Sequence, residues 1–348
     1  MDRPAVPAAL PRAPGDALGP TGAPRLGAYQ GSFGKVDLAP LAPEGLLASV
    51  RHAARLKRWQ RVVLTTEHHV LALAIVDGGT LASGAVWVAE RRRGEVLFAR
   101  AAGGVPALNV RVGDHPGPGA RASFAAPGIE LLLERRSDRF QLEADLGSSL
   151  QLEAYLDARG EPEPFALVAP LPGGGLRAAQ LTGPLAVSGA LSVRGRSHAV
   201  EGGLAAIDYG AGLFPREVAW RKVTAAGRLP DGRPLALHLA EGLDGVEPGD
   251  GGEDVLLAAG GPHRLPPVVF EADPGSPTAP WRIASLDGAV ELAFRPAASH
   301  RDARELLLVS ARTAQHAGEL TGRLPAPGGG ELLVEGLPGL IEDFAARW

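Results

Sequence analysis

The sequence contains no cysteine in its 348 residues, which excludes disulfides, thiolate nucleophiles and cysteine-ligated zinc sites. Neither sign of charge dominates: 35 basic residues face 39 acidic ones, and the formal net charge is −4. The longest basic run, Arg91 to Arg93, is short and is expected to be a solvated loop. Without a large positive field, we expect no nucleic-acid partner.

Long apolar runs are also missing. No segment reaches the roughly 18 uninterrupted apolar residues that a membrane-spanning helix needs, so no membrane span is expected. The Pro-rich N-terminal residues 1–42 lack a basic start followed by an apolar run, and this composition predicts a poorly ordered arm. A cytoplasmic location is the default expectation.

The common catalytic motifs are absent as well. The sequence has no GxGxxG that opens a helix after a strand, no GxxxxGK[ST], no HExxH, no GxSxG and no EF-hand loop. Its nine histidines are scattered, and the adjacent pair His68 and His69 would point to opposite faces of a strand. We therefore expect neither a cofactor nor a metal site.

Regular elements are present in large number. Apolar residues at helical spacing predict one short helix within residues 43–58. After Trp59 the apolar period changes to two, most clearly in residues 139–157, which predict a hairpin with one apolar face. Similar strand-like runs occupy residues 62–76, 85–89, 96–101, 108–112, 129–134, 185–193, 235–239, 267–271, 281–285, 290–294, 305–311, 318–324 and 331–335. The pattern predicts an all-β fold of antiparallel sheets, closed as barrels or stacked as sandwiches.

One break in composition suggests a domain boundary. Residues 241–254 are acidic, Gly-rich and without periodicity. We therefore predict an arm at 1–42, a first domain with the helix at 43–245 and a smaller second domain at 246–348. Leu340, Ile341, Phe344 and Trp348 stand at helical spacing, which favours a short closing helix.

The stretch from Ile207 to Val223, IDYGAGLFPREVAWRKV, gathers the most varied chemistry of the chain. It places an acid and a phenol (Asp208, Tyr209), Arg216 and Trp220 around a glycine turn. Such a group suggests the wall of a pocket. The alternative is an exposed hairpin with one aromatic side chain in the core.

Several segments in a fixed order carry a resemblance to a known family. They are RLKRWQ, a strand that ends in IVDGG, IDYGAGLFPREVAWRKV, DGRPLALHLAEG, the pair Glu253-Asp254, LPPVVFEAD, PWRIASLDGAVELAFRP, QHAGELTG and GLIEDFAARW. From Arg55 to Trp348 the chain resembles the DUF2804 family, which is similar to the carotenoid 1,2-hydratase and AttH superfamily. The resemblance implies two tandem lipocalin-like antiparallel β-barrels with a ligand site in or between them.

The resemblance also implies roles for some residues. Asp208 falls where the carotenoid hydratases have a catalytic-type Asp, but Tyr209 follows this acid instead of preceding it. Relative to DUF2804 chains, His238 replaces an Asn, and Glu253-Asp254 stands in place of Glu-Asn. No match to the upstream His-x-Trp of the hydratases is found.

Two functions therefore remain open at this point. The first is a cofactor-independent enzyme, such as a hydratase, isomerase or cyclase, that acts on a large apolar molecule. In it, a neutral Asp208 would donate a proton, Tyr209 or His238 would orient water, and Trp220 or Trp281 would face developing positive charge. The second is a non-catalytic carrier of a lipid or other apolar ligand.

Each candidate also has a structural alternative. Asp208 can cap a turn and Trp220 can fill the core, while Arg216 either clamps a ligand carboxylate or lies on the surface. Gln315 is a ligand-binding candidate or hydrogen-bonds within the second barrel, as Glu342 would. The sequence leaves the oligomeric state open.

Overall fold

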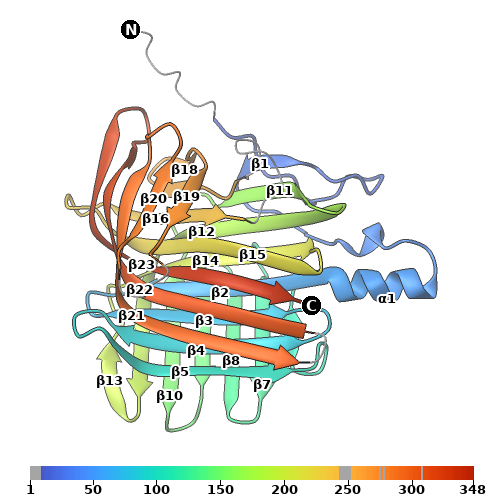
Figure 1. Cartoon of the computed structure of the whole chain (residues 1–348), viewed down its shortest axis with the longest axis horizontal. Helices are drawn as coiled ribbons and strands as arrows, with labels where there is room; N and C mark the ends of the chain where they lie inside the picture. The colour runs from blue at the N-terminus through green and yellow to red at the C-terminus, as the bar shows by residue number, and fades with distance from the viewer. Residues whose placement is uncertain (1–8, 243–251, 274–275, 277–278, 307–308) are drawn as a thin grey trace.

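The computed structural model describes residues 9–242, 252–273, 276, 279–306 and 309–348. The described residues form one short α-helix, one 3-10 turn and two antiparallel β-sheets (Figure 1). Helix α1 spans Leu46–Arg55, inside the predicted range, and leads directly into strand β2. The 3-10 turn η1 spans Ala39–Leu41.

The first sheet has 14 strands in the order β5-β4-β3-β2-β14-β12-β10-β9-β8-β7-β6, while β11 and β13 pair with β12 and β1 pairs with β11. Its strands are β1 Gly27–Gln30, β2 Leu56–Thr65, β3 His69–Asp77, β4 Ala82–Glu90, β5 Glu95–Gly104, β6 Val110–Val112, β7 Arg121–Ala126, β8 Ile129–Arg136, β9 Arg139–Asp145, β10 Leu150–Asp157, β11 Phe165–Leu171, β12 Gly175–Val193, β13 Arg196–Ala199 and β14 Leu204–Leu213. The sheet curls around one large apolar core.

The second sheet has nine strands in the order β18-β17-β16-β15-β23-β22-β21-β20-β19. Its strands are β15 Glu217–Arg228, β16 Pro234–Glu241, β17 Val255–Ala258, β18 Gly261–Arg264, β19 Val268–Glu271, β20 Trp281–Ser285, β21 Glu291–Leu306, β22 Val309–Pro325 and β23 Glu331–Arg347. It has a separate apolar core of its own. The sheets change between β14 and β15, whereas the predicted boundary at 245/246 lies in residues 243–251, outside the described residues.

Strand β14 is buried along its whole length because both of its faces are covered. Ile207, Tyr209 and Ala211 point into the core of the first sheet. Ala206, on the opposite face, packs against Ala226 and Ala236 of the second sheet. Side chains of the same face as Ala206, including Asp208, therefore lie at the seam between the two sheets.

The N-terminal arm differs from the prediction. Residues 9–42 lie against the first sheet, where β1 pairs with β11 and the side chains of Phe33, Val36 and Leu38 are fully buried in its core. A few apolar residues among the prolines supply enough buried surface to fix the segment, although its composition is typical of disorder.

The C-terminal helix prediction is wrong. Residues 331–347 form β23, which hydrogen-bonds to β15 on one side and β22 on the other. Residues 339–342 of this strand are buried on both faces, so the alternation is lost there and the apolar residues also fit helical spacing.

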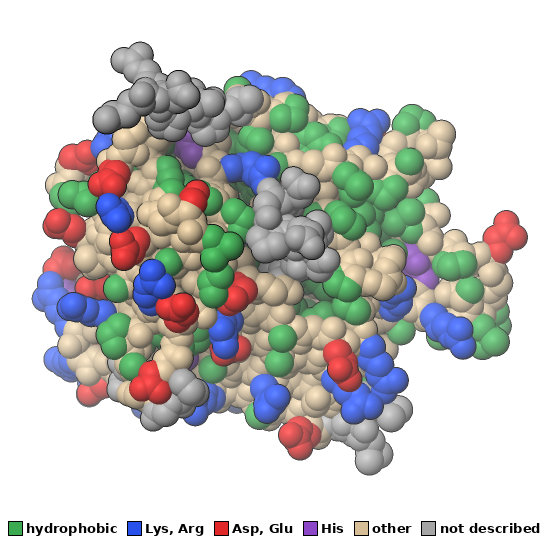
Figure 2. Space-filling view, turned by 45° about the horizontal axis from the view of Figure 1, so that its top comes forward, with side chains coloured by type: hydrophobic (Ala, Val, Ile, Leu, Met, Phe, Trp, Pro, Cys, Tyr) green, Lys and Arg blue, Asp and Glu red, His purple; other side chains and the backbone are tan. Residues whose placement is uncertain are grey.

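The described helices include none that is both long and apolar enough to cross a membrane. On the face shown in Figure 2, Lys and Arg side chains are interspersed with Asp and Glu side chains.

Candidate functional site

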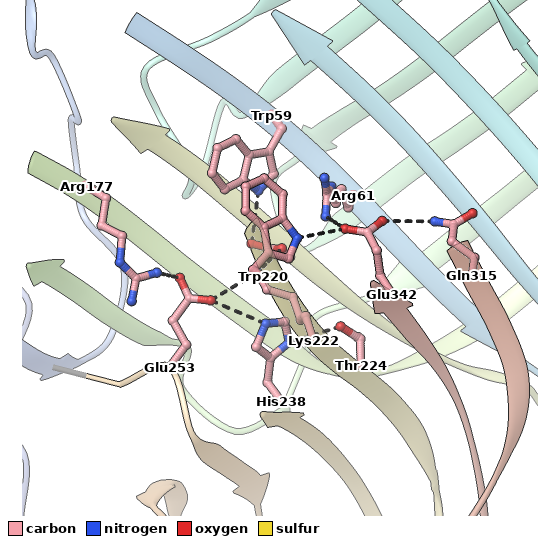
Figure 3. A network of polar contacts seen from close by, with 11 residues as sticks. Trp59, Arg61, Arg177, Trp220, Lys222, Thr224, His238, Glu253, Gln315 and Glu342 are labelled. Carbon is pink, nitrogen blue, oxygen red and sulfur yellow. Dashed lines mark hydrogen bonds and ion pairs between the residues drawn. The ribbon is translucent and has the colours of Figure 1, made fainter. Parts of the chain in front are cut away.

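A cluster of buried charged side chains lies at the seam between the two sheets (Figure 3). Asp208 of β14 and Lys222 of β15 are each 3% exposed, and Glu253, which precedes β17, is fully buried. Lys222 Nζ lies 2.9 Å from Asp208 Oδ2 and 3.0 Å from Glu253 Oε2. The ammonium group therefore bridges two carboxylates in a region closed to solvent.

Further partners complete this cluster. Arg177 of β12 forms an ion pair with Glu253 Oε1. His238 Nε2 of β16 lies 3.6 Å from Glu253 Oε2, and His238 Nδ1 is 3.2 Å from Thr224 Oγ1. Two cations thus balance two carboxylates, as burial away from water requires.

The electrostatic effects in the cluster are mutual. Burial alone raises the pKa of Asp208, but Lys222 and His238 outweigh it and hold this pKa below its ordinary value. Burial also opposes ionisation of Glu253, whose pKa is nevertheless held well below the usual range by Arg177 and Lys222. Burial and Lys222 lower the pKa of His238. At neutral pH both acids are ionised and the imidazole is uncharged.

A second ion pair lies next to the first cluster. Arg61 of β2 forms an ion pair with Glu342 Oε1 of β23. The same oxygen accepts a hydrogen bond from Trp220 Nε1 at 3.0 Å, and Glu342 Oε2 accepts one from Gln315 Nε2 at 3.0 Å. Three donors fix the carboxylate of Glu342, so its orientation is well defined.

Aromatic rings pack between the two clusters. The indoles of Trp59 and Trp220 are stacked with centroids 6.3 Å apart, and Trp59 Nε1 donates to Asp208 Oδ1 at 3.3 Å. The guanidinium of Arg61 lies 5.7 Å and 5.6 Å from the two indole centroids. Gly210 leaves room for Trp59, because a Cβ atom at this position would lie 2.2 Å from Cε2 of the indole. The glycine of the motif is thus required by the tryptophan across the strand pair.

An apolar-walled cavity with a volume of about 460 Å³ opens beside this arrangement at the seam. Strands β2 to β5 of the first sheet and β21 to β23 of the second contribute its walls. Its aromatic lining comes from Trp59, Trp87, Trp220, Phe344 and Trp348, and its polar groups include Lys57, Arg61, Gln315 and Glu342. This volume is in the range of known small-molecule sites.

Lys57 is a buried cation in the wall of this cavity. Its Nζ donates to the backbone carbonyls of Ala54 and Gly78 and lies 4.9 Å from the ring centroid of Trp348. Burial lowers its pKa to about 8.

A smaller space of about 40 Å³ adjoins the cavity. Asp208, Lys222 and Thr224 line it together with Arg61, Gln315 and Glu342, so it connects the inner charged cluster with the polar groups of the cavity. Its volume is sufficient for a water molecule, and polar partners surround it.

The structure brings together four of the seven site residues predicted from the sequence: Asp208, His238, Trp220 and Gln315. The other three lie elsewhere. The buried hydroxyl of Tyr209 points into the core of the first sheet and has no hydrogen-bond partner among the described residues. Arg216 is exposed between β14 and β15, and Trp281 packs in the core of the second sheet.

Sequence reasoning assigned no role to Arg61, Arg177 or Lys222. Lys222 lies two residues after Trp220 in the same motif, so strand alternation would have placed both side chains on one face. Nothing local marks the other two, because their partners are far away in the sequence. The described residues contain no group of three or more His, Cys, Asp or Glu side chains arranged to hold a metal ion.

Comparisons with known proteins agree with this architecture. The family model described as a domain of unknown function, DUF2804, matches residues 11–348. The chain belongs to the DUF2804 family. A search of curated proteins found no match for this DUF2804 chain.

Solved structures share the fold of the DUF2804 chain at low identity. An AttH-type protein, NE1406 from Nitrosomonas europaea, is 15% identical with a TM-score of 0.50, over 84% of this chain and 92% of its own. Kievitone hydratase from Nectria haematococca is 12% identical with a TM-score of 0.52, over 84% and 88% of the two chains. CghA, solved with Sch210972, is 10% identical with a TM-score of 0.52 over the same shares. The DUF2804 chain therefore has the predicted all-β, lipocalin-like fold, in which the two antiparallel sheets form near-barrels or half-barrels.

Proposed function

We propose that the chain binds a large, mostly apolar small molecule in the cavity at the seam and transforms it without a cofactor, in a hydratase-, isomerase- or cyclase-like reaction. The observation that carries this proposal is the position of the polar groups. The cavity of about 460 Å³ has mostly apolar walls, and Arg61, Gln315 and Glu342 form a hydrogen-bonded set where it meets the inner cluster. Kievitone hydratase, which shares the fold, is a hydratase by name.

The proton in such a reaction belongs to the pair of Asp208 and Lys222. Because the pKa of Asp208 is lowered, the isolated neutral acid expected from the sequence does not describe this carboxylate at neutral pH. The hydrogen bond of 2.9 Å places a Lys222 proton beside Asp208, so the pair can release a proton through the carboxyl group and leave a neutral amine. The space of about 40 Å³ gives this proton a route towards the cavity through one water molecule.

Other groups would bind the ligand. Trp220 presents its ring to the cavity, and Arg61 and Gln315 offer hydrogen-bond donors beside Glu342. His238, which lies behind Lys222, would act as a positioning residue through Glu253. Arginine and tryptophan faces suit a ligand with unsaturated apolar parts and one or two oxygen atoms.

The experiment is a screen of apolar and polyene-like ligands, scored for binding by tryptophan fluorescence and for product by mass spectrometry. Asp208→Asn keeps the shape of the side chain and removes the acid, so turnover should fall by about two to four orders of magnitude while affinity barely changes. Tyr209→Phe is the matched control, because the neighbouring side chain points away from the seam. This control should retain both affinity and turnover.

Equal product from the wild type and Asp208→Asn would overturn the catalytic role of Asp208. A carrier is the second candidate, since each buried carboxylate of the seam already has a cationic partner. Saturable binding with no product from any bound ligand would favour the carrier.

A further inference from the structure

A second concave site lies at the end of the first sheet that is opposite to α1. Three turns meet there: the β2–β3 turn, the β4–β5 turn and the β12–β13 turn (Figure 1). They enclose a groove of about 730 Å³, whose lining includes His69, His198, Glu90, Arg93, Arg194 and Arg196. None of these residues lines the seam cavity.

Charge in the groove is predominantly positive. Both oxygens of Glu90 accept hydrogen bonds from backbone N–H groups of the β4–β5 turn, and Arg92 forms an ion pair with Glu67. In the part of the chain that the structure describes, no carboxylate lies within ion-pairing distance of Arg93, Arg194 or Arg196. Three guanidinium groups from two turns are thus available to one ligand.

Two imidazoles lie side by side in the groove. His69 is 6% exposed, and its Nε2 is 3.1 Å from Nδ1 of His198. The other ring nitrogen of His69, Nδ1, is buried and has no hydrogen-bond partner among the described residues. Backbone N–H bonds to Thr66 Oγ1, at 3.2 Å from His68 and 2.9 Å from His69, fix this turn. A buried ring nitrogen without a hydrogen-bond partner costs free energy unless a ligand completes its hydrogen bonding.

We propose that this groove binds the phosphate or sulfate group of a small molecule, between Arg93, Arg194 and Arg196 and against the His69–His198 pair. Guanidinium groups match the oxygens of such anions in bidentate geometry. The groove has room beside such a group for the organic part of a small molecule. A flat lipid surface does not match this groove, because His69 is buried.

The test uses the full chain with sodium sulfate as the probe, followed by calorimetry and by the NMR signals of the histidine rings. Sulfate keeps its charge between pH 6 and 8, so a pH dependence comes from the protein. We expect saturable binding that shifts the His69 and His198 signals first. Arg93→Gln with Arg196→Gln should weaken binding by at least about tenfold, since each removes a charged hydrogen-bond donor. The control, Arg25→Gln with Arg51→Gln, removes the same charge from exposed arginines outside the groove and should leave affinity unchanged.

Binding should tighten as the pH falls, because the groove then gains positive charge. Burial and the neighbouring His198 lower the pKa of His69, whereas Glu90 acts in the opposite direction and His68 adds to the lowering. The other charged groups that line the groove are Arg92, Arg93, Glu95, Arg194 and Arg196. A bound anion would favour protonation of His69.

Three results would overturn the proposal: no saturable sulfate binding, equal weakening by both double variants, or unchanged His69 and His198 signals at saturation. A further experiment measures binding to vesicles of phosphatidylcholine with phosphatidic acid. Binding to these vesicles without binding of free sulfate would show that the ligand is a lipid surface and would also refute the small-molecule site.

Discussion

Replacement of Lys222 by Met tests the buried charge cluster most directly. The substitution keeps most of the side-chain volume and removes the cation that lies 2.9 Å from Asp208 and 3.0 Å from Glu253. Glu253 keeps Arg177 as a partner, whereas Asp208 keeps, among the described residues, only the hydrogen bond from Trp59. Asp208 is therefore the carboxylate that the substitution leaves without a cationic partner.

Removal of one partner of a buried ion pair costs about 3–5 kcal/mol, because it leaves the other charge uncompensated. We expect the free energy of unfolding to fall by about this amount at pH 7, as measured by urea unfolding followed by circular dichroism. Adding Asp208→Asn to Lys222→Met removes the carboxylate that has lost its partner. The double variant should therefore recover part of the lost free energy of unfolding. The recovered part is the coupling between the two side chains.

The pH dependence gives a second signature. In the wild type the pKa of Asp208 is lowered from its ordinary value of 3.8. The ionised carboxylate therefore stabilises the folded state above this pH, and this stabilisation is lost as the pH falls through the folded pKa. In Lys222→Met, the cation that lowers the pKa of Asp208 is gone, so burial raises this pKa. The cost of burying the ionised Asp208 is therefore absent at low pH, where the acid is neutral, and grows as the pH rises. The difference between the two proteins should be larger at pH 7 than at about pH 5. A loss below about 1 kcal/mol at pH 7, with no recovery in the double variant, would refute this account.

Three further predictions concern packing. Gly210→Ala should destabilise the fold by at least about 1–3 kcal/mol, seen in thermal melting, because its Cβ would lie 2.2 Å from the Trp59 ring; an unchanged melting temperature would show that the indole moves freely. Tyr209→Phe should change the free energy of unfolding by less than about 1 kcal/mol, because the lost hydroxyl has no partner among the described residues; a large loss in urea unfolding would reveal one. Phe33→Ala should cost about 3–5 kcal/mol in the same assay, since the ring is fully buried in the first core; wild-type stability would mean that the arm does not contribute to the fold.

Much of the fold could be predicted from the sequence because most strands have one buried face. The hairpin predicted in residues 139–157 is formed by β9 and β10, with alternating burial in both strands. Prediction failed where this alternation disappears. In β23 the four consecutive residues 339–342 are buried, so the C-terminal apolar residues fitted a helix equally well.

The candidate site was predicted less completely for a related reason. Asp208 and Tyr209 are neighbours in the sequence and were assigned to one site, but adjacent residues of a strand point to opposite faces. Once β14 is placed between two layers, only Asp208 can face the seam. The same rule separates Trp220 and Lys222 from Arg221 on β15, where Arg221 is only partly buried and contacts Asp343 at 3.6 Å.

Most of the remaining site residues could not be found locally, because three ion pairs of the seam join one sheet to the other. Asp208 pairs with Lys222, Arg177 with Glu253, and Arg61 with Glu342, at sequence separations of 14, 76 and 281 residues. Buried ion pairs contribute little net stability, but an incorrect alignment of the sheets would leave several charges buried without partners. The three pairs can therefore fix how the sheets dock. Because the seam cavity is bounded by both sheets, the same pairs also determine its shape, so a ligand in the cavity would be held by groups whose positions depend on correct docking.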